Sequence, residues 1–319
     1  MRKAILEKIE KYQSIVIFGH LNPDGDCYGS QIAFRRSLRL KYPDKKIYAV
    51  GSGLPRFFKM LGRMDVVPES VIEQSLAIIV DGNDLPRMED QRVFKALDFV
   101  KFDHHIDIGS FTEGPYIVDE DASSCSEIIM DFFREFDFPI DEIVAQALLL
   151  GIVTDTARFQ FVSDFPKVFK EVAYLCELGA KPDTLNTVLN ITNEESAIFK
   201  GFVYSHYKKT ENGVLYLYLS KRQLHKFKLS ANGASGMVNL LSNIKGYPIW
   251  SFICENKDTS IHVEIRSNGP AVQPIALKYG GGGHQNAAGT TIVNPTEEII
   301  NAILSDLDEL AKKYKEENM

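Results

Sequence analysis

Residues 14–26 read SIVIFGHLNPDGD, and this stretch decides the fold class. It opens with a short run of β-branched and aromatic side chains, which is typical of a buried strand. His20, Asp24 and Asp26 follow, separated by a proline and a glycine that allow a sharp turn. A helix of apolar and basic residues is expected over 29–41. The stretch therefore predicts a strand, a polar turn and a helix, which together form the first half of a βαβ unit.

The same alternation continues through the first half of the chain. Strands are expected at 46–50 (KIYAV), 76–80 (LAIIV) and 97–102 (LDFVKF). Further helices are predicted at 126–136 and 141–150, and another begins at Pro166 and stops at Gly179. Strands that alternate with helices predict an α/β domain, a parallel sheet with helices on both faces.

The chain has 319 residues, a length that favours two domains. We predict a first domain at 1–180, a weakly patterned linker at 181–198 and a second domain at 199–319. In the second, the apolar runs 202–210 and 214–220 flank Glu211-Asn212-Gly213, a strong hairpin signal. A helix near 235–242, strands at 249–255 and 260–265, and a charged C-terminal helix are also expected. This pattern predicts a smaller α+β domain.

Composition and charge exclude several classes of protein. The net charge of -7 argues against binding to long duplex nucleic acid, which depends on phosphate neutralisation. The longest apolar stretches are too short to cross a bilayer, and the N-terminus lacks the apolar segment of a signal peptide. The four cysteines form no CxxC pair, which favours reduced thiols in the cytoplasm. Residues 200–295 carry 11 basic and 4 acidic residues, either by chance or because this part collects phosphate.

Acidic and histidine side chains stand where the predicted strands end. Asp81 follows the third strand, Asp103-His104-His105 end the fourth, and Asp155 follows an apolar helix. Because these ends lie at one edge of a parallel sheet, we expect these groups to meet the aspartates of the opening stretch. Each like-charge pair at 4 Å would cost about 4 kcal/mol at an effective dielectric near 20, so cations must neutralise them. Such mixed ligands suit Mn²⁺, Zn²⁺ or Fe²⁺ more than Ca²⁺. Alternation along the strand predicts that the two histidines point opposite ways.

The second domain contains a glycine-rich stretch at 280–289, GGGGHQNAAG, preceded in the sequence by Arg266-Ser267. Consecutive glycines let backbone N–H groups approach an anion, and the Ala-Ala-Gly that follows can begin a helix whose dipole points at that anion. We interpret the stretch as a phosphate-binding loop, with a flexible loop as the alternative.

Five motifs carry a resemblance to a known family. HLNPDGD (20–26), VDGND (80–84), DHH (103–105), GIVTDT (151–156) and GGGGHQNAAG (280–289) resemble the signature motifs of the DHH phosphoesterase superfamily. The last motif resembles the DHH-associated C-terminal domain of exonucleases and oligoribonucleases, and not the C-terminal domain of family II pyrophosphatases. The two-domain length is similar to the bacterial nano-RNase (oligoribonuclease) and 3′-phosphoadenosine 5′-phosphate (pAp) phosphatase group.

The resemblance implies two Mn²⁺ ions, with Mg²⁺, Co²⁺ or Fe²⁺ as substitutes. It implies that Asp103 orients a ligand histidine and that His105 faces the scissile phosphate, so these two are the expected catalytic residues. Asp81 is expected to bridge the two ions. The implied ligands are His20, Asp24 and Asp81 for one ion, and Asp26, Asp81, His104 and Asp155 for the other.

The resemblance also implies an active site in the cleft between the domains. Cys27-Tyr28 and Ala157 differ from the residues that are usual in the family's motifs. They are expected to touch no metal ligand. Arg158, beside the Asp155 motif, is a further candidate for contacting a nucleotide. The residues expected to hold the terminal phosphate of the substrate are Arg266, Ser267, Gly281, Gly282, Gly283 and His284.

The implied activity is hydrolysis of short single-stranded RNA to nucleoside 5′-monophosphates, and of pAp to AMP and phosphate. The nearest alternative is a phosphodiesterase for cyclic di-AMP or linear pApA, which shares every motif. A regulator that has lost catalysis is disfavoured because no ligand is missing, and a pyrophosphatase because of the glycine-rich motif. The sequence leaves open whether the protein forms a homodimer.

Overall fold

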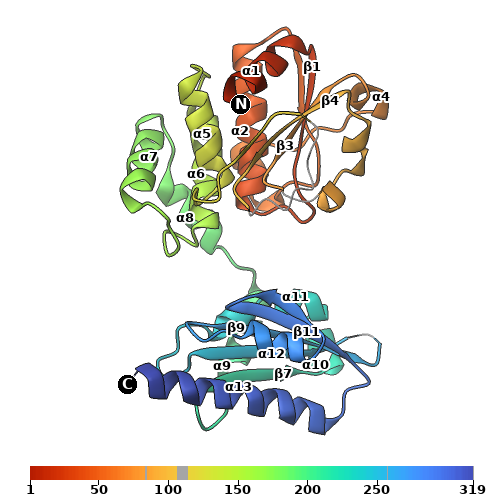
Figure 1. The fold of residues 1–319 in the computed structure, drawn as a ribbon, viewed down its shortest axis with the longest axis vertical. Coiled ribbons are helices and arrows are strands. Elements are labelled where there is room, and N and C mark those ends of the chain that lie inside the picture. The colour runs from red at the N-terminus through yellow and green to blue at the C-terminus, as the bar shows by residue number, and fades with distance from the viewer. Residues whose placement is uncertain (83–84, 106–113, 257, 319) are drawn as a thin grey trace. The chain divides into compact units, whose positions relative to one another are not determined.

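The computed structural model describes residues 1–82, 85–105, 114–256 and 258–318. The chain divides into two compact units, Met1–Ile191 and Thr192–Met319 (Figure 1). Within the described residues, no helix combines the length and apolar composition that crossing a bilayer requires.

The first unit is built on a five-stranded, entirely parallel sheet in the order β2-β1-β3-β4-β5. This confirms the predicted α/β class. β1 and β3 have the predicted bounds, β2 ends one residue earlier than predicted, and β4 begins and ends one residue later. The strands are β1 (Ser14–Phe18), β2 (Lys46–Ala49), β3 (Leu76–Val80), β4 (Asp98–Asp103) and β5 (Tyr116–Val118).

Both faces of this sheet are covered, as predicted. Ile15 and Ile17 of β1 pack into the larger core with the main helices, while Val16 and Phe18 face a smaller core that includes Ile72 of α4. The helices are α1 (Arg2–Lys11), α2 (Gly25–Lys41), α3 (Phe58–Leu61), α4 (Glu69–Ile72), α5 (Cys125–Glu135), α6 (Glu142–Asp155), α7 (Phe165–Glu177) and α8 (Pro182–Asn190), with 3₁₀ turns η1 (Pro55–Phe57), η2 (Leu85–Arg87) and η3 (Gln91–Lys95).

Helices α2 and α6 lie side by side at glycine positions (Figure 1). A Cβ atom on Gly29 would lie 2.3 Å from the carbonyl oxygen of Ala147. A Cβ atom on Gly151 would lie 2.3 Å from Oδ1 of Asp26. These glycines therefore allow the close approach that brings the start of α2 and the end of α6 to the same place.

The second unit contains a six-stranded mixed sheet in the order β10-β11-β9-β8-β7-β6. Only β7 and β8 are paired in parallel; the other neighbours are antiparallel. The strands are β6 (Lys208–Lys209), β7 (Val214–Leu219), β8 (Ile249–Glu255), β9 (Ser260–Ser267), β10 (Gly282–His284) and β11 (Ala287–Val293).

Two separate cores cover the two faces of this sheet. Leu215, Leu217 and Leu219 of β7 pack with α9, α10, α11 and η4, while Val214 joins the core formed with α12 and α13. This confirms the α+β class. The helices are α9 (Glu194–His206), α10 (Lys221–Lys226), α11 (Ala231–Ser235), η4 (Val238–Leu241), α12 (Gln273–Lys278) and α13 (Glu297–Asn318).

Three local predictions were wrong. Most of 202–210, expected as a strand, belongs to α9, because Phe199 and Val203 are spaced for one helical face. Much of the expected linker forms α8, which begins at Pro182, the favoured first position of a helix. Residues 287–289 form the start of β11 and not a helix, because β11 pairs with both β9 and β10.

Candidate metal centre and substrate-binding residues

Three neighbouring strands deliver side chains to one edge of the first sheet. His20 lies just beyond β1, Asp81 directly follows β3, and Asp103 ends β4. The backbone N–H of Asp81 donates to the carbonyl oxygen of Phe102 at 2.9 Å, which fixes the end of β3 beside β4. Because β1, β3 and β4 run parallel, these three ends meet at their carboxyl edge.

Helix ends deliver the remaining acidic groups. Asp24 is the N-cap of α2, and its Oδ1 accepts from the backbone N–H groups of Asp26 and Cys27. Asp26 lies in the first turn of the same helix. Asp155 is the last residue of α6, which lies against α2. Helices α2 and α6 therefore add three more carboxylates to the strand edge.

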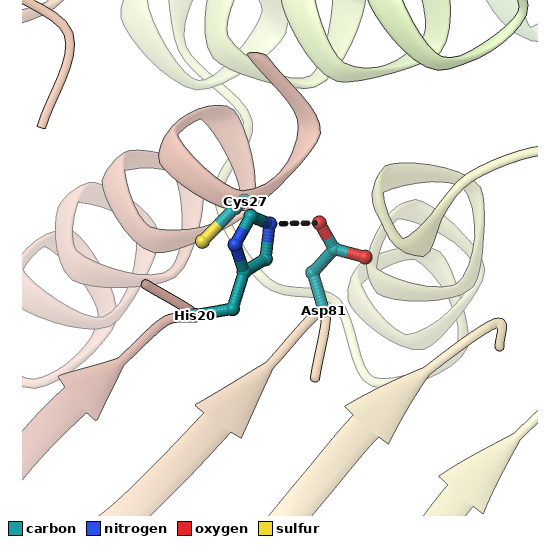
Figure 2. Close-up of side chains that lie close together, drawn as sticks. All are labelled: His20, Cys27 and Asp81. Atoms are coloured by element: carbon teal, nitrogen blue, oxygen red, sulfur yellow. Dashed lines mark ion pairs between the residues drawn. The ribbon is translucent and has the colours of Figure 1, made fainter. Parts of the chain in front are cut away.

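Asp81 is at the centre of the group. Its side chain is 2% exposed, and Nε2 of His20 lies 3.5 Å from its Oδ2 (Figure 2). Nε2 of His104 lies 3.5 Å and Nδ1 of His105 3.7 Å from its Oδ1. Oδ1 is buried without a hydrogen-bond partner, an arrangement that costs free energy unless something positive binds it.

A second group forms around Asp26, His104 and Asp155. Nε2 of His104 lies 3.1 Å from Oδ2 of Asp155. Asp26 is fully buried and accepts from the backbone N–H groups of Cys125 at 2.6 Å and Ser126 at 3.0 Å. These backbone donors fix the Asp26 carboxyl group between α2 and the start of α5.

Burial and neighbouring charges shift the pKa values of several groups in this centre. Burial raises the pKa of Asp26 well above its usual value, with further contributions from the charges of Asp81 and Asp155. Burial raises the pKa of Asp155 to about 6. Burial disfavours the charged form of His104, but the attraction of the nearby Asp81 carboxylate outweighs it and the pKa rises to about 10. A bound cation would replace the proton that this shift favours on His104.

The donor atoms suit divalent ions of the transition series. Three sets of side chains place one nitrogen, oxygen or sulfur donor each within 4.8 Å of one another. Mixed imidazole and carboxylate donors match Mn²⁺, Fe²⁺ or Zn²⁺ better than Ca²⁺. The three sets are His20, Cys27 and Asp81; Asp81, His104 and His105; and Asp26, His104 and Asp155.

Most predicted ligands lie in these sets, but Asp24 does not. Oδ1 of Asp24 lies 3.8 Å from Nε2 of His20, and its side chain is 54% exposed. Its N-cap hydrogen bonds occupy this same oxygen, so Asp24 has a structural role in addition to any ligand role.

The prediction that His104 and His105 point opposite ways was wrong. Their ring centroids are 4.5 Å apart. Nε2 of His104 and Nδ1 of His105 both approach the carboxylate of Asp81. β4 ends at Asp103, so the alternation of a strand does not continue through these two residues.

Asp103 contacts a different histidine from the one expected. Its Oδ1 lies 2.9 Å from Nδ1 of His105, whereas Nδ1 of His104, the expected ligand, lies 3.3 Å from the carbonyl oxygen of Ala122. This hydrogen bond raises the pKa of His105, the histidine expected to face substrate.

Cys27 was expected to touch no ligand, and this prediction was also wrong. Its side chain is fully buried beside His20 and Asp81 (Figure 2). The signal was present in the sequence, because Cys27 is three residues after the N-cap Asp24 and therefore in the first turn of α2, which points at the site.

Arg158 lies in an unusual backbone segment just after α6. Ala157, Arg158 and Phe159 all have positive φ, at 48°, 60° and 65°. Arg158 is exposed, while Phe159 packs against Phe169 of α7 at a ring distance of 5.4 Å. The left-handed turn thus separates an exposed cation from a packed aromatic ring.

Two of the candidate phosphate-binding residues of the second unit, Arg266 and Ser267, form hydrogen bonds within that unit. Nη1 of Arg266 donates to Oε1 of Glu264, whose Oε2 is 2.9 Å from Nε2 of His262. Ser267 is buried and donates to the carbonyl oxygen of Pro270 at 2.6 Å, an internal contact.

The glycine-rich stretch forms a hairpin. The backbone N–H of Gly281 donates to the carbonyl oxygen of Ala276 at 2.8 Å, so it is not free for an anion. Gly282, Gly283 and His284 form β10, and the side of the hairpin at Gly283 and His284 is exposed. A Cβ atom on Gly281 would lie 2.1 Å from the carbonyl oxygen of Gly289, which explains the need for glycine there.

Comparison with known proteins matches both units. Residues 14–152 match the DHH family, N-terminal domain, and residues 211–313 match the DHHA1 domain. The bifunctional oligoribonuclease and PAP phosphatase NrnA of Bacillus subtilis (strain 168) is 34% identical, with 99% of this chain and 100% of that protein covered. The cyclic-di-AMP phosphodiesterase PdeA of Listeria monocytogenes is 26% identical, over 94% of this chain and 49% of that protein.

A solved structure shares the fold. An exopolyphosphatase-related protein from Bacteroides fragilis superposes with a TM-score of 0.83 at 23% identity, covering 98% of this chain and 96% of that one. Together with the assembled motif residues, these matches show that the chain belongs to the DHH phosphoesterase superfamily and joins a DHH N-terminal domain to a DHHA1 domain.

Proposed function

We propose that the protein is a Mn²⁺-dependent phosphodiesterase that hydrolyses short RNA oligonucleotides to nucleoside 5′-monophosphates, and pAp to AMP and phosphate. The observation that carries the proposal is the Asp81 carboxylate, which is 2% exposed, is approached by nitrogen atoms of three histidines and has one oxygen without a hydrogen bond. The NrnA relative, named as a bifunctional oligoribonuclease and PAP phosphatase, supports the choice of substrates.

The proposal assigns the metal ligands to the first domain, residues 1–180. Two divalent ions would share Asp81, and when bound they would polarise a phosphoryl oxygen and make water acidic enough to lose a proton near pH 7. Asp24 completes the set on its exposed side. The proposed ligands are His20, Asp24, Asp26, Asp81, His104 and Asp155.

His105 contacts the scissile phosphate in this proposal. Its Nδ1 is held by Asp103 at 2.9 Å, and its side chain is 46% exposed. The hydrogen bond to Asp103 raises the pKa of His105, which favours the protonated ring, whose Nε2 can donate to a phosphate oxygen. Asp103 thus orients His105 and stabilises its charge.

The second domain, residues 199–319, joined through 181–198, binds the terminal phosphate of the substrate. Arg266, His284 and the exposed hairpin glycines are the proposed contacts. Both reactions break the bond between phosphorus and a 3′ oxygen, so one centre can perform both. We place this activity in the cytoplasm.

A second candidate is hydrolysis of cyclic di-AMP or linear pApA. The partial relative PdeA favours it, and the centre described above does not distinguish these phosphodiesters. We rank it second because the match covers a larger share of NrnA than of PdeA, and at higher sequence identity.

A substrate panel tests the proposal. The full chain, stripped of metal and supplied with Mn²⁺, is given 5′-phosphorylated RNA from dimer to decamer, pAp, pApA, cyclic di-AMP and pyrophosphate. We expect turnover of the RNA dimer and pAp to exceed that of the decamer and pyrophosphate, and EDTA to abolish it. Faster turnover of pApA or cyclic di-AMP would favour the second candidate, and turnover of pyrophosphate alone would reject both.

A further inference from the structure

Cys27 lies inside the proposed centre and has no role in the function proposed above. It is in the first turn of α2, its side chain is 0% exposed, and its backbone N–H donates to Asp24 at 3.0 Å. Its Sγ, one nitrogen of His20 and one carboxylate oxygen of Asp81 lie within 4.8 Å of one another (Figure 2). The thiol is therefore placed with a histidine and an aspartate and not alone.

The other two members of the set are oriented for a ligand. Nδ1 of His20 is 3.0 Å from the carbonyl oxygen of Leu21, which leaves Nε2 facing Asp81. Asp81 is 98% buried, and its Oδ2 lies 3.5 Å from Nε2 of His20, while its other oxygen, Oδ1, lies towards His104 and His105 and has no hydrogen bond. The pair of His20 and Asp81 is independent of the cysteine, and a histidine nitrogen facing a buried carboxylate oxygen provides two donors for a cation at this place.

A second buried cysteine gives the contrast. Cys125 also lies at the base of the centre, where its backbone N–H donates to Asp26. Its Sγ, however, donates to the carbonyl oxygen of Phe102 at 3.3 Å. The Cys125 thiol thus has a backbone partner, and it appears in none of the ligand sets found among the described residues.

We propose that Cys27 is a ligand of the ion held by His20 and Asp81, so that this half of the centre contains a sulfur donor. The inference rests on the proposed function for the existence of that ion. Binding replaces the thiol proton, which leaves to solvent, by the metal, with no change of oxidation state. Thiolate is a soft donor that favours Zn²⁺, Co²⁺ or Cd²⁺ over Mn²⁺. The site with Cys27 would therefore prefer different metals from the set Asp26, His104 and Asp155, whose donors are only nitrogen and oxygen.

Cobalt spectroscopy tests the assignment directly. The metal-free full chain is titrated with Co²⁺, and the absorption spectrum is recorded together with the cobalt bound per chain. We expect a thiolate-to-cobalt charge-transfer band in the parent protein and in Cys125→Ser, and its loss in Cys27→Ser. Cobalt binding without the band in the parent, or a band that persists in Cys27→Ser, would overturn the assignment.

Metal affinity gives a second readout. In Cys27→Ser and Cys27→Ala, the affinity for Zn²⁺ should fall at least about tenfold, the loss seen when even an outer partner of a ligand is removed. The affinity for Mn²⁺ should change less. Equal losses for both metals would contradict a sulfur ligand. Having two variants guards against a failure to fold, which circular dichroism detects.

The same samples separate this inference from the proposed function. Hydrolysis of an RNA dimer by the parent protein with Mn²⁺, but no cobalt band, would reject Cys27 as a ligand and leave the function standing. A cobalt band without hydrolysis of any phosphodiester would support Cys27 as a ligand and reject the proposed function.

Discussion

The carboxylate of Asp81 is the side chain whose loss should have the largest effect on activity. Nitrogen atoms of three histidines lie within 3.7 Å of its two oxygens, and the proposal makes it the bridge between two ions. Asp81→Ala should therefore abolish hydrolysis with every metal, because nothing then shields the two cations from each other. Appreciable turnover of the RNA dimer by this variant with Mn²⁺ would refute the two-ion assignment.

His105→Ala is the informative comparison. Because His105 is proposed to act on substrate, the variant should bind the same amount of metal as the parent while its kcat falls about a hundredfold, within the range for lost general acid catalysis. Metal content per chain and steady-state rates measure the two effects. A variant that loses metal would show that the roles of His104 and His105 are exchanged.

At the level of single residues, sequence reasoning placed the members of the centre but not their orientations. His20, Asp81 and Asp155 could be predicted because strand ends and a helix end define their positions. The direction of His105 could not, since it depends on where β4 stops and on the hydrogen bond to Asp103. The place of Cys27 in the first turn of α2 could be predicted, but its contact with His20 depends on the turn formed by 20–26, which no periodicity describes.

Between elements, the α2–α6 contact is the most sensitive point. A methyl group at Gly151 would lie 2.0 Å from Oγ of Ser126 and 2.3 Å from Oδ1 of Asp26. Gly151→Ala should destabilise the protein by about 1–3 kcal/mol through overpacking and should weaken metal binding by displacing Asp26. Urea denaturation and metal titration check both effects.

Gly201→Ala on α9 is the matched control. A Cβ atom there meets nothing within 4 Å, so alanine should stabilise the helix by about 0.5–1 kcal/mol. Equal effects of the two substitutions would show that close packing at Gly151 does not matter.

A buried carboxyl group between α5 and α7 should make stability depend on pH. Glu171 is 3% exposed, and one of its oxygens has no hydrogen-bond partner. Burial, together with the charge of Glu127, raises its pKa to about 8 from an ordinary value of 4.5. Its stabilising contribution is therefore complete below about pH 4.5 and is lost as the pH rises through 8.

Glu171→Gln removes this titration. At pH 9 the variant should be more stable than the parent by about 1–3 kcal/mol, the cost of an unsatisfied buried group, and the difference should shrink towards pH 5. Denaturation curves between pH 5 and 9 measure it. Glu177→Gln, on an exposed position of the same helix, should change little; a pH-independent gain in Glu171→Gln would contradict the assignment.

Regular elements were predictable where the pattern was simple. β1 and β3 are buried on both faces, so their apolar runs mark their ends clearly. The prediction of a strand at 202–210 was wrong because aromatic residues occur in both strands and helices. Packing of Phe199 and Val203 in the core stabilises α9 instead. The glycines at 280–283 suggested an open loop, but pairing with β11 orders Gly282 and Gly283 into β10.

For the whole molecule, the proposal divides metal binding and phosphate binding between two units. Arg266→Ala should therefore reduce kcat/KM for RNA dimers and pAp about tenfold to a hundredfold, the effect of losing roughly 1.5–3 kcal/mol from a charged hydrogen bond. Metal content should not change. Bis-p-nitrophenyl phosphate carries no terminal phosphate, and the variant should hydrolyse it nearly as fast as the parent.

The ion pair with Glu264 sharpens this test. If Arg266 only supports β9 through Glu264, both substrates should lose activity equally, and the phosphate-binding role would be rejected. The sequence predicted Arg266 from its position before the glycine-rich motif, but the partner two residues away on the same face of β9 became apparent only in the folded sheet.

Every residue of the proposed metal centre lies between His20 and Asp155, within a unit that ends at Ile191. A ribosome adds about 5–20 residues per second, so synthesis of the 128 residues of the second unit takes roughly 6–26 s. During that interval the first unit has all of its strands, and an ion that binds to it adds its binding free energy to folding. Metal supply would then act on the newborn chain, before the unit proposed to bind the substrate's terminal phosphate exists.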